Sequence, residues 1–378
     1  MTVNHCSRII KAISIYYKTK DIPLNNARRS NSIAFRVDAT PQIGLGHFFR
    51  VDRLATMFLK HGWQVIIILK SAENLKFSDS RIEVIPVITE NLEEQALEIK
   101  RICKGKIFQH LVFDISHFEN VHNRRKDMLS VFQNLKDQIE YLHCIDDFIM
   151  FPFEFTTHFV PYWDAQFISF TKLSKTEYHL GLEFFVLYET EKVKVEEREF
   201  SKPLHWFICF GGSDSRRATV KALELVVRLE TTEYSATVNI GKFFEKEHCI
   251  QIRNLAKTNH KIEIIESGNI QNEIRRSDLA FLSGGLTKYE ACYHGVPQII
   301  IPQFSEEEER MNSFSKAGTS LILDNVERFL FEQNLKRLKG LIQTPSSLIK
   351  MSAQGRKIVD GMGAQRMFQI ISQQRIVN

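Results

Sequence analysis

The sequence predicts an α/β protein built from two Rossmann-like domains in series, and three observations carry this prediction. Short apolar, β-rich segments alternate with amphipathic helical segments from residue 32 onward. The expected strands are almost continuous apolar runs, which is typical of parallel strands covered on both faces. A charged stretch, Glu189–Lys202, interrupts the alternation directly before Pro203, and the alternation then restarts. Two such domains place a cleft between the carboxyl ends of their sheets.

The same pattern predicts the domain boundaries and the elements in order. We expect a basic N-terminal arm at residues 1–30, an N-terminal Rossmann-like domain at 31–190, a C-terminal one at 203–345 and a helical tail at 346–378. The first domain has expected strands at Ser32–Val37, Gln64–Leu69, His110–Asp114 and Tyr141–Asp146, and expected helices at Gly46–Gly62, Leu92–Cys103 and Asn123–Lys136. The second has expected strands at Leu204–Phe210, Ser235–Ile240, Ile262–Ile265, Leu279–Leu282 and Gln298–Ile301, and expected helices at Arg217–Leu229, Phe244–Thr258, Asn272–Arg276, Thr287–Tyr293 and Glu307–Lys316.

Composition excludes several classes of protein. The chain has 378 residues with 43% hydrophobic and 25% charged side chains, an ordinary globular composition that excludes collagen and wholesale disorder. The formal net charge of +5 comes from the first 30 residues, and the remainder carries equal numbers of acidic and basic side chains. A neutral body without zinc-finger spacing favours no nucleic-acid partner.

Apolar runs and cysteines indicate the compartment. The longest apolar runs, Val65–Leu69 and Gln298–Pro302, are far shorter than the roughly 18 residues of a membrane-spanning helix, so we expect no membrane span. The six cysteines are scattered singly without a CxxC pair. This spacing is typical of reduced thiols, so we expect a cytoplasmic protein.

The first motif that could carry chemistry follows the first strand. Arg36 and Asp38 end that strand, and Gly44, Gly46 and His47 open the next helix. Glycines let the backbone approach a ligand, and a helix N-terminus favours an anion. The same terminus disfavours a cationic imidazole, so we expect His47 to be neutral and able to accept a proton as the catalytic base. The alternative is a tight turn in which His47 only caps the helix.

The second motif, Gly211-Gly212-Ser213-Asp214, directly follows the first strand of the second domain. Its glycines again allow close approach of a ligand at a strand-to-helix turn. Ser213 and Asp214 fit ligand binding and capping of the following helix about equally well.

The third motif runs from Ser283 to Ala291 and is the most specific of the three. Gly284 and Gly285 expose backbone N–H groups that suit a diphosphate. Glu290 lies one turn into the following helix, where a carboxylate can accept both hydroxyls of a ribose. The alternative role for Glu290, an interaction with the helix dipole, does not require the two preceding glycines.

Histidines and acids never recur at metal-ligand spacing in the sequence. We therefore expect no metal site, no cofactor and a metal-independent reaction.

Together these motifs resemble the UDP-sugar hydrolase of bacterial pseudaminic acid biosynthesis, a relative of the two-domain GT-B glycosyltransferases. The likeness runs from about Ile33 to Gly318 and takes in Ile145–Asp147 and Gly181–Leu187. It implies a GT-B-like fold and hydrolysis of a UDP-linked (di)acetamido deoxy sugar in nonulosonic acid biosynthesis. It also implies other enzymes of the glycan pathway as candidate partners.

The resemblance assigns roles to individual residues. It implies that His47 is essential for hydrolysis and that Gly44 and Gly46 lie at the diphosphate and sugar. The further implied UDP contacts are Gly284, Gly285, Thr287, Glu290 and the loop Ser267–Ile270 beside the uracil, which includes Asn269. The substrate-binding candidates from the motifs themselves are Arg36, Asp38, Gly211, Gly212 and Ser213, joined by Glu309 and Asn312 in a later helix.

Two positions depart from the family pattern. Ser116 stands where the family usually has a tyrosine, and Glu309 stands where it commonly has a glutamine, whereas Asn312 is retained. Three hypotheses therefore stay open: a UDP-sugar hydrolase, a GT-B glycosyltransferase favoured by the missing tyrosine, and a catalytically silent UDP-sugar-binding subunit.

Overall fold

The computed structural model describes most of the chain beyond the basic arm. The described residues are 31–40, 44–71, 75–88, 92–105, 108–114, 129, 131–133, 135, 139–145, 153–167, 169–187, 198–229, 233–266 and 269–374. Several predictions fall outside them: the arm at residues 1–30, Ser116, Asp146, Ser267 and most of the helix expected at Asn123–Lys136.

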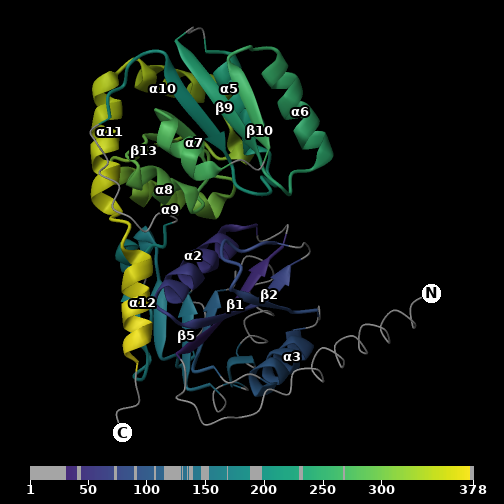
Figure 1. Ribbon diagram of the computed structural model, residues 1–378. Coiled ribbons are helices and arrows are strands. Elements are labelled where there is room, and N and C mark those ends of the chain that lie inside the picture. Colours follow the sequence, from purple (N-terminus) through teal and green to yellow (C-terminus); the bar gives the residue numbers. More distant parts are fainter. Residues whose placement is uncertain are drawn as a thin grey trace, which may run out of the picture. The chain divides into compact units, whose positions relative to one another are not determined.

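The N-terminal sheet is parallel throughout its described strands (Figure 1). Its strand order is β3-β2-β1-β4-β5-β6-β7. The strands are β1 (Ser32–Ala39), β2 (Gln64–Ser71), β3 (Glu83–Pro86), β4 (His110–Asp114), β5 (Tyr141–Ile145), β6 (Thr157–Val160) and β7 (Glu177–Leu180). The register aligns Ser32 with Gln64 and Ile33 with His110. Every residue of β1 is buried, as expected for a central parallel strand covered on both faces.

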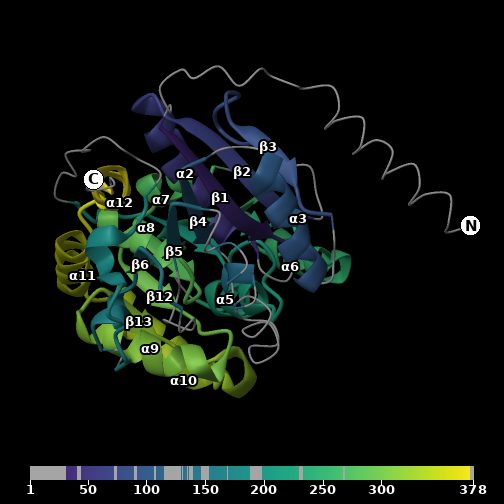
Figure 2. The same ribbon diagram turned by 90° about the horizontal axis from the view of Figure 1, so that it is seen from below.

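Helices cover both faces of this sheet. Helices α2 (Gly46–Lys60) and α12 (Gly363–Gln373) pack on one face, where Phe58 of α2 shares a buried cluster with Phe35 of β1. Helix α3 (Leu92–Gly105) packs on the other face, where Ile99 shares a cluster with Ala34. Figure 2 shows α3 and α2 beside β1 and β2. The alternation of Ala34 and Phe35 between the two clusters follows from the two-residue period of a strand.

The C-terminal sheet is also parallel, in the order β10-β9-β8-β11-β12-β13. Its strands are β8 (Leu204–Cys209), β9 (Tyr234–Ile240), β10 (Ile262–Glu266), β11 (Leu279–Leu282), β12 (Gln298–Ile300) and β13 (Ser320–Ile322). Its helices are α5 (Ala218–Val227), α6 (Lys246–Lys257), α7 (Ile270–Arg276), α8 (Thr287–Tyr293), α9 (Ser305–Lys316), α10 (Phe331–Ile342) and α11 (Pro345–Ile358).

Each sheet has a point where the strand order changes direction. In the N-terminal sheet this point lies between β1 and β4, and in the C-terminal sheet it lies between β8 and β11. Ligands of open α/β sheets bind outside the carboxyl ends of the strands at such switch points. All three motifs follow the carboxyl ends of these strands, since they come after β1, β8 and β11.

The predicted strands and helices agree closely with the structure in the described residues. Strands His110–Asp114 and Leu279–Leu282 and helix Thr287–Tyr293 have the predicted bounds. Four strands were not predicted: β3, β6, β7 and β13. Each has only three or four residues, and the side chains of β7 are partly exposed, so no long apolar run marks them.

The two helices of the segment expected as a tail pack into the cores. Gly355 of α11 lies against α8, where an added Cβ would come within 3.2 Å of the Cys292 backbone. Met367 and Ile371 of α12 belong to the buried cluster of the N-terminal sheet. These helices are therefore packed parts of the fold. None of the helices in the described part of the chain has the length and apolar character needed to cross a bilayer.

The end of the expected linker is packed against the C-terminal sheet. Arg198 donates hydrogen bonds from Nε to the carbonyl of His294 at 2.8 Å, from Nη1 to that of Ser277 at 2.5 Å and from Nη2 to that of Arg275 at 2.7 Å. Burial lowers the pKa of this guanidinium. Just before the linker, Phe185 packs in a buried cluster with side chains of α8 and α9. The charged composition of the linker did not indicate these contacts.

Candidate functional site

The turn of the first motif lies beside the turns of the other two. A Cβ added to Gly46 would lie 3.2 Å from Cδ1 of Leu286, which joins the first motif to the third. A Cβ added to Gly212 would lie 3.9 Å from Cγ of Leu45, which joins the second motif to the first. The structure therefore gathers at one place the three turns that the sequence singled out. An alanine at Gly46 would press against Leu286, whose side chain would have to move by a few tenths of an ångström.

His47 lies in the first turn of α2, and its imidazole is directed at the carboxyl end of β4. Its Nδ1 atom is 2.6 Å from Oδ1 of Asp114. The His47 side chain is 11% exposed and that of Asp114 is fully buried. The sequence did not predict this contact between the His47 ring and the Asp114 carboxylate. A histidine that only caps the helix would not need it.

Arg50 holds the same carboxylate from the next turn of α2. Its Nε donates to Oδ2 of Asp114 at 2.7 Å and its Nη2 donates to Oδ1 at 2.5 Å. Its Nη1 donates to the hydroxyl of Tyr162 at 2.5 Å. Burial would raise the pKa of Asp114, but the charges and hydrogen bonds of Arg50 and His47 outweigh burial and lower this pKa to about 2.

This network determines which nitrogen of His47 is basic. Asp114 is ionised at neutral pH and can only accept hydrogen bonds. Nδ1 of His47 lies 2.6 Å from Oδ1 of Asp114 and 3.0 Å from Nη2 of Arg50, which donates to the same oxygen at 2.5 Å. We therefore assign the imidazole proton to Nδ1, so that both groups donate to Oδ1. The basic lone pair is then on Nε2. A carboxylate behind the ring also stabilises the imidazolium that forms when Nε2 takes a proton. His47 and Asp114 can thus act as a general base and its positioning residue.

Arg36 and Asp38 were expected to bind substrate, and the structure pairs them with each other. Nη1 of Arg36 lies 2.5 Å from Oδ1 of Asp38, and Nη2 donates to Gln95 of α3 at 3.3 Å. Both are buried within β1. The contact with Gln95 lies toward α3, on the opposite side of the sheet from α2.

The second motif forms a tight turn against the end of β9. Gly211 has a φ of 83°, a conformation that favours glycine. Asp214 accepts hydrogen bonds from the backbone N–H groups of Ala218 at 2.8 Å and Thr219 at 2.9 Å, so it caps α5. Burial raises the pKa of Asp214 to about 6. Ser213 is partly buried in the same turn.

Lys288 lies in the first turn of α8, next to the two glycines of the third motif. It was not among the predicted site residues. Its Nζ donates to the carbonyl of Gly284 at 2.5 Å and to that of Gly285 at 3.1 Å. The residue is 4% exposed, and burial lowers the pKa of its ammonium to about 8. These two hydrogen bonds hold the carbonyls of Gly284 and Gly285 toward the buried ammonium of Lys288.

Glu290, the expected ribose acceptor, already has a cationic partner. Its Oε1 accepts a hydrogen bond from Nη2 of Arg53 at 2.9 Å. The two side chains are 7% and 9% exposed, respectively. Arg53 was not a predicted site residue, because nothing in the sequence indicates that α2 contacts α8.

The other predicted residues take different places. Thr287 begins α8, and Asn269 caps α7 by accepting from the N–H of Asn272 at 3.2 Å. Asn312 is exposed on α9. Glu309 lies in α9, but its side chain is outside the described part of the structure. Within the described residues, no group of three or more His, Cys, Asp or Glu side chains could hold a metal ion.

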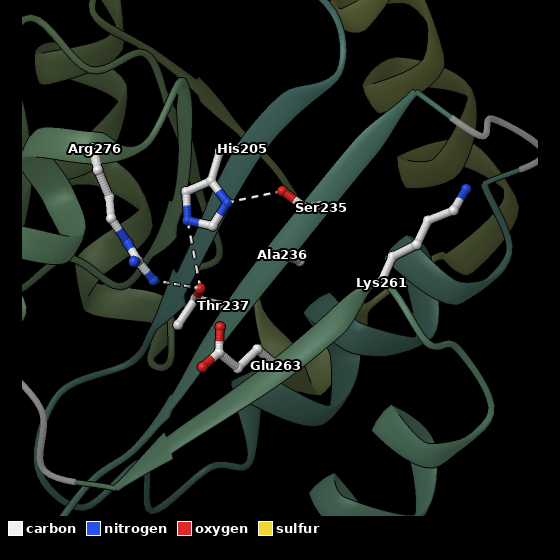
Figure 3. A pocket seen from close by; sticks show the side chains of 7 residues that line it. All are labelled: His205, Ser235, Ala236, Thr237, Lys261, Glu263 and Arg276. Carbon is white, nitrogen blue, oxygen red and sulfur yellow. Dashed lines mark hydrogen bonds between the residues drawn. The ribbon is translucent and has the colours of Figure 1, made fainter.

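A separate polar cavity of about 260 Å³ lies at the amino ends of β8, β9 and β10. Figure 3 shows His205 and Arg276 both directed at Thr237 there. The glycine turns follow the carboxyl ends of the strands, so this cavity lies at the other edge of the C-terminal sheet. No predicted site residue lines it.

Comparison with curated proteins finds distant relatives. No protein-family model matches the chain. An uncharacterized protein of Methanocaldococcus jannaschii, MJ1062, is 24% identical over 322 residues, which are 75% of this chain and 58% of that protein. The spore coat polysaccharide biosynthesis protein SpsG of Bacillus subtilis is 21% identical over 198 residues, which are 52% of this chain and 58% of that protein. The chain thus spans less than two thirds of the length of these relatives.

Comparison with solved structures shows the fold. The UDP-GlcNAc 2-epimerase of Neisseria meningitidis, solved with bound UDP-GlcNAc, is 12% identical with a TM-score of 0.60, and the match covers 91% of this chain and all of that one. MurG of Acinetobacter baumannii is 12% identical with a TM-score of 0.58, over 91% of this chain and all of that one. The predicted fold class is confirmed: the chain has a GT-B-like fold with two Rossmann-like domains.

Proposed function

We propose that this chain is a GT-B-type enzyme that hydrolyses a UDP-sugar, with His47 as the general base. The observation that carries the proposal is the hydrogen bond between His47 and Asp114 beside the three glycine turns. A buried carboxylate that fixes the tautomer of a histidine is the arrangement that general base catalysis needs.

The proposed reaction is a displacement at the anomeric carbon. Nε2 of His47 takes a proton from water while the water oxygen bonds to the anomeric carbon. The bond between that carbon and the oxygen of the diphosphate breaks, and the electron pair leaves with UDP. Asp114 stays ionised and stabilises the imidazolium until the proton is released to solvent.

The third motif is the proposed nucleotide site. Lys288 holds the carbonyls of Gly284 and Gly285, which supports an orientation of these peptides in which their N–H groups meet the diphosphate. Glu290 offers a buried carboxylate one turn further along α8, where ribose hydroxyls can donate to it. Gly44 and Gly46 would then approach the diphosphate and sugar from the first motif.

The comparisons support the proposal at a coarser level. One curated relative is named as a spore coat polysaccharide biosynthesis protein, and one solved structure of the same fold contains UDP-GlcNAc. Both favour a sugar-nucleotide enzyme of glycan biosynthesis. The finer assignment, a UDP-linked (di)acetamido deoxy sugar in nonulosonic acid biosynthesis, rests on the motif resemblance alone.

A glycosyltransferase is the second candidate, favoured by Ser116 in place of a tyrosine. In that case Nε2 of His47 takes its proton from an acceptor hydroxyl instead of water. The chemistry at the anomeric carbon and the nucleotide site is otherwise the same.

One experiment separates the candidates. The purified protein is incubated with UDP-sugars, and free UDP is measured with and without sugar acceptors. We expect release of UDP without an acceptor, as hydrolysis requires. Release only with an acceptor would replace the hydrolase with a transferase. Binding of a UDP-sugar without any release would indicate a catalytically silent subunit.

A further inference from the structure

Arg53 connects the helix of the candidate base to the helix of the candidate ribose acceptor. It lies on α2, and its Nη2 donates to Oε1 of Glu290 on α8 at 2.9 Å. Its Nη1 donates to the carbonyl of Val186 at 3.1 Å. One guanidinium thus joins α2, α8 and the segment that precedes the linker. Neither the motifs nor the resemblance assigns a role to this arginine.

Arg53 belongs to a row of polar side chains along α2. His47, Arg50 and Arg53 are spaced three residues apart, so each is a neighbour of the next on the surface of the helix. The first two engage Asp114 at the end of β4, and the third engages Glu290. A single rigid helix therefore contacts both the proposed catalytic pair and the proposed nucleotide site.

The ion pair holds one oxygen of Glu290. Within the part of the chain that the structure describes, the hydrogen bond to this carboxylate comes from Arg53 and reaches Oε1. The side chain of Glu290 is 7% exposed and that of Arg53 is 9% exposed, so solvent screens the pair weakly. Such a partner offsets the lost solvation of a buried carboxylate and fixes the direction of its side chain.

We propose that Arg53 is a positioning residue that fixes Glu290 for the ribose hydroxyls and ties the nucleotide site to α2. In this arrangement Oε1 stays with Arg53 while Oε2 accepts from the ribose. Arg53 itself does not contact the nucleotide. The inference deepens the proposed function and rests on it, because it needs Glu290 to bind a UDP ribose.

A double-mutant cycle on UDP affinity tests this inference. Titration calorimetry compares the full chain with Arg53→Met, Glu290→Gln and the double variant. If Arg53 acts through Glu290, each single change weakens UDP binding by roughly 10- to 150-fold, as loss of a hydrogen bond to a charged group should. The double variant is then no weaker than the worse single variant. Additive losses would show that Arg53 acts on UDP by another route and would overturn the inference.

Kinetics and a conservative variant distinguish positioning from a general structural defect. We expect Arg53→Met to raise the KM for the UDP-sugar about tenfold with little change in kcat, because ribose binding should weaken while the base is untouched. Arg53→Lys keeps the charge but not the fork that reaches both Glu290 and Val186, so it should bind UDP with intermediate affinity. If Arg53→Met does not fold, the UDP affinity of Arg53→Lys provides the test. An Arg53→Lys variant that binds UDP as tightly as the wild type would contradict the inference.

A matched control removes an arginine elsewhere. Arg81 is 61% exposed and pairs with Asp79, so Arg81→Met deletes an equal charge that contacts neither Arg53 nor Glu290. Its UDP affinity should equal that of the wild type. Wild-type UDP affinity in Arg53→Met combined with a loss in Glu290→Gln would overturn the inference and leave the proposed function standing. Absence of UDP binding by the wild-type protein would overturn both.

Discussion

Nδ1 of His47 lies 2.6 Å from Oδ1 of Asp114, although 67 positions separate the two residues in the chain. The contact joins the start of α2 to the end of β4, two elements that meet because β4 pairs with β1 in the sheet. Arg50 keeps Asp114 ionised with a pKa of about 2. The carboxylate of Asp114 therefore stays ionised at every pH above about 4.

Replacing Asp114 by Asn tests the role of this carboxylate. Asparagine keeps the size of the side chain but no longer fixes the Nδ1–H tautomer or balances the imidazolium, so turnover should fall by about 10²–10⁴. UDP affinity should change less than threefold, because no nucleotide contact is lost. Steady-state kinetics measures the turnover and calorimetry measures the UDP affinity, with thermal unfolding as a check on folding. Asp79→Asn, at an exposed ion pair, serves as the matched control. Near-normal turnover in Asp114→Asn would remove Asp114 from the mechanism.

Lys288 predicts a pH dependence of nucleotide binding. Burial lowers the pKa of its ammonium to about 8, so the charge beneath Gly284 and Gly285 is lost as the pH rises through 8. UDP affinity should therefore fall between about pH 7 and pH 9.

The comparison variant is Lys288→Met, which should bind UDP weakly at all pH values and show a flat profile over this range. Calorimetry at several pH values gives the result. An unchanged profile in Lys288→Met would mean that another group titrates.

The sheet interior predicts acid sensitivity of the fold. His110 on β4 and His143 on β5 are buried, with Nδ1 of His110 3.0 Å from Nε2 of His143. Burial lowers the pKa of His110 to about 4 and that of His143 well below its usual value. The unfolded chain thus binds more protons than the folded chain below about pH 6.5, and stability should fall as the pH drops from 6.5 toward 4.

His110→Phe provides the test of this acid sensitivity. The variant removes one of the two buried imidazoles, so the free energy of unfolding should depend less steeply on pH between 6.5 and 4. Denaturant unfolding at several pH values measures the slope, which is informative even if the variant is less stable overall. An unchanged slope would show that other buried groups, such as His248 and His294, control unfolding in this pH range.

Local patterns predicted most of the fold. Continuous apolar runs and glycines at helix starts placed β1, β8, β11 and α8 close to their observed bounds, because those signals depend on neighbouring residues. The short edge strand β7 was missed because its partly exposed side chains give no apolar run. The packing of α12 on α2 was also missed, since the sequence does not say where an amphipathic helix docks.

The sequence could predict only those site residues that belong to a local motif. The sequence singled out His47, the glycine turns and Glu290 by local signals of spacing and residue type, and their roles stay predictions. It missed Arg53 and Lys288, whose partners depend on how separate elements meet. It also assigned Arg36 and Asp38 to the substrate, which stays a prediction; in the structure these two side chains pair with each other.

The most direct test of the account is UDP release by wild-type protein and by His47→Asn, measured with a UDP-linked diacetamido sugar and no acceptor. Asparagine preserves size and some hydrogen bonding but cannot take the proton from water, so turnover should fall by roughly 10²–10⁴. UDP affinity, measured alongside, should change little because it depends on Gly284, Gly285 and Glu290. Near-normal turnover in His47→Asn with the wild-type pH profile would contradict the assignment of His47 as the base.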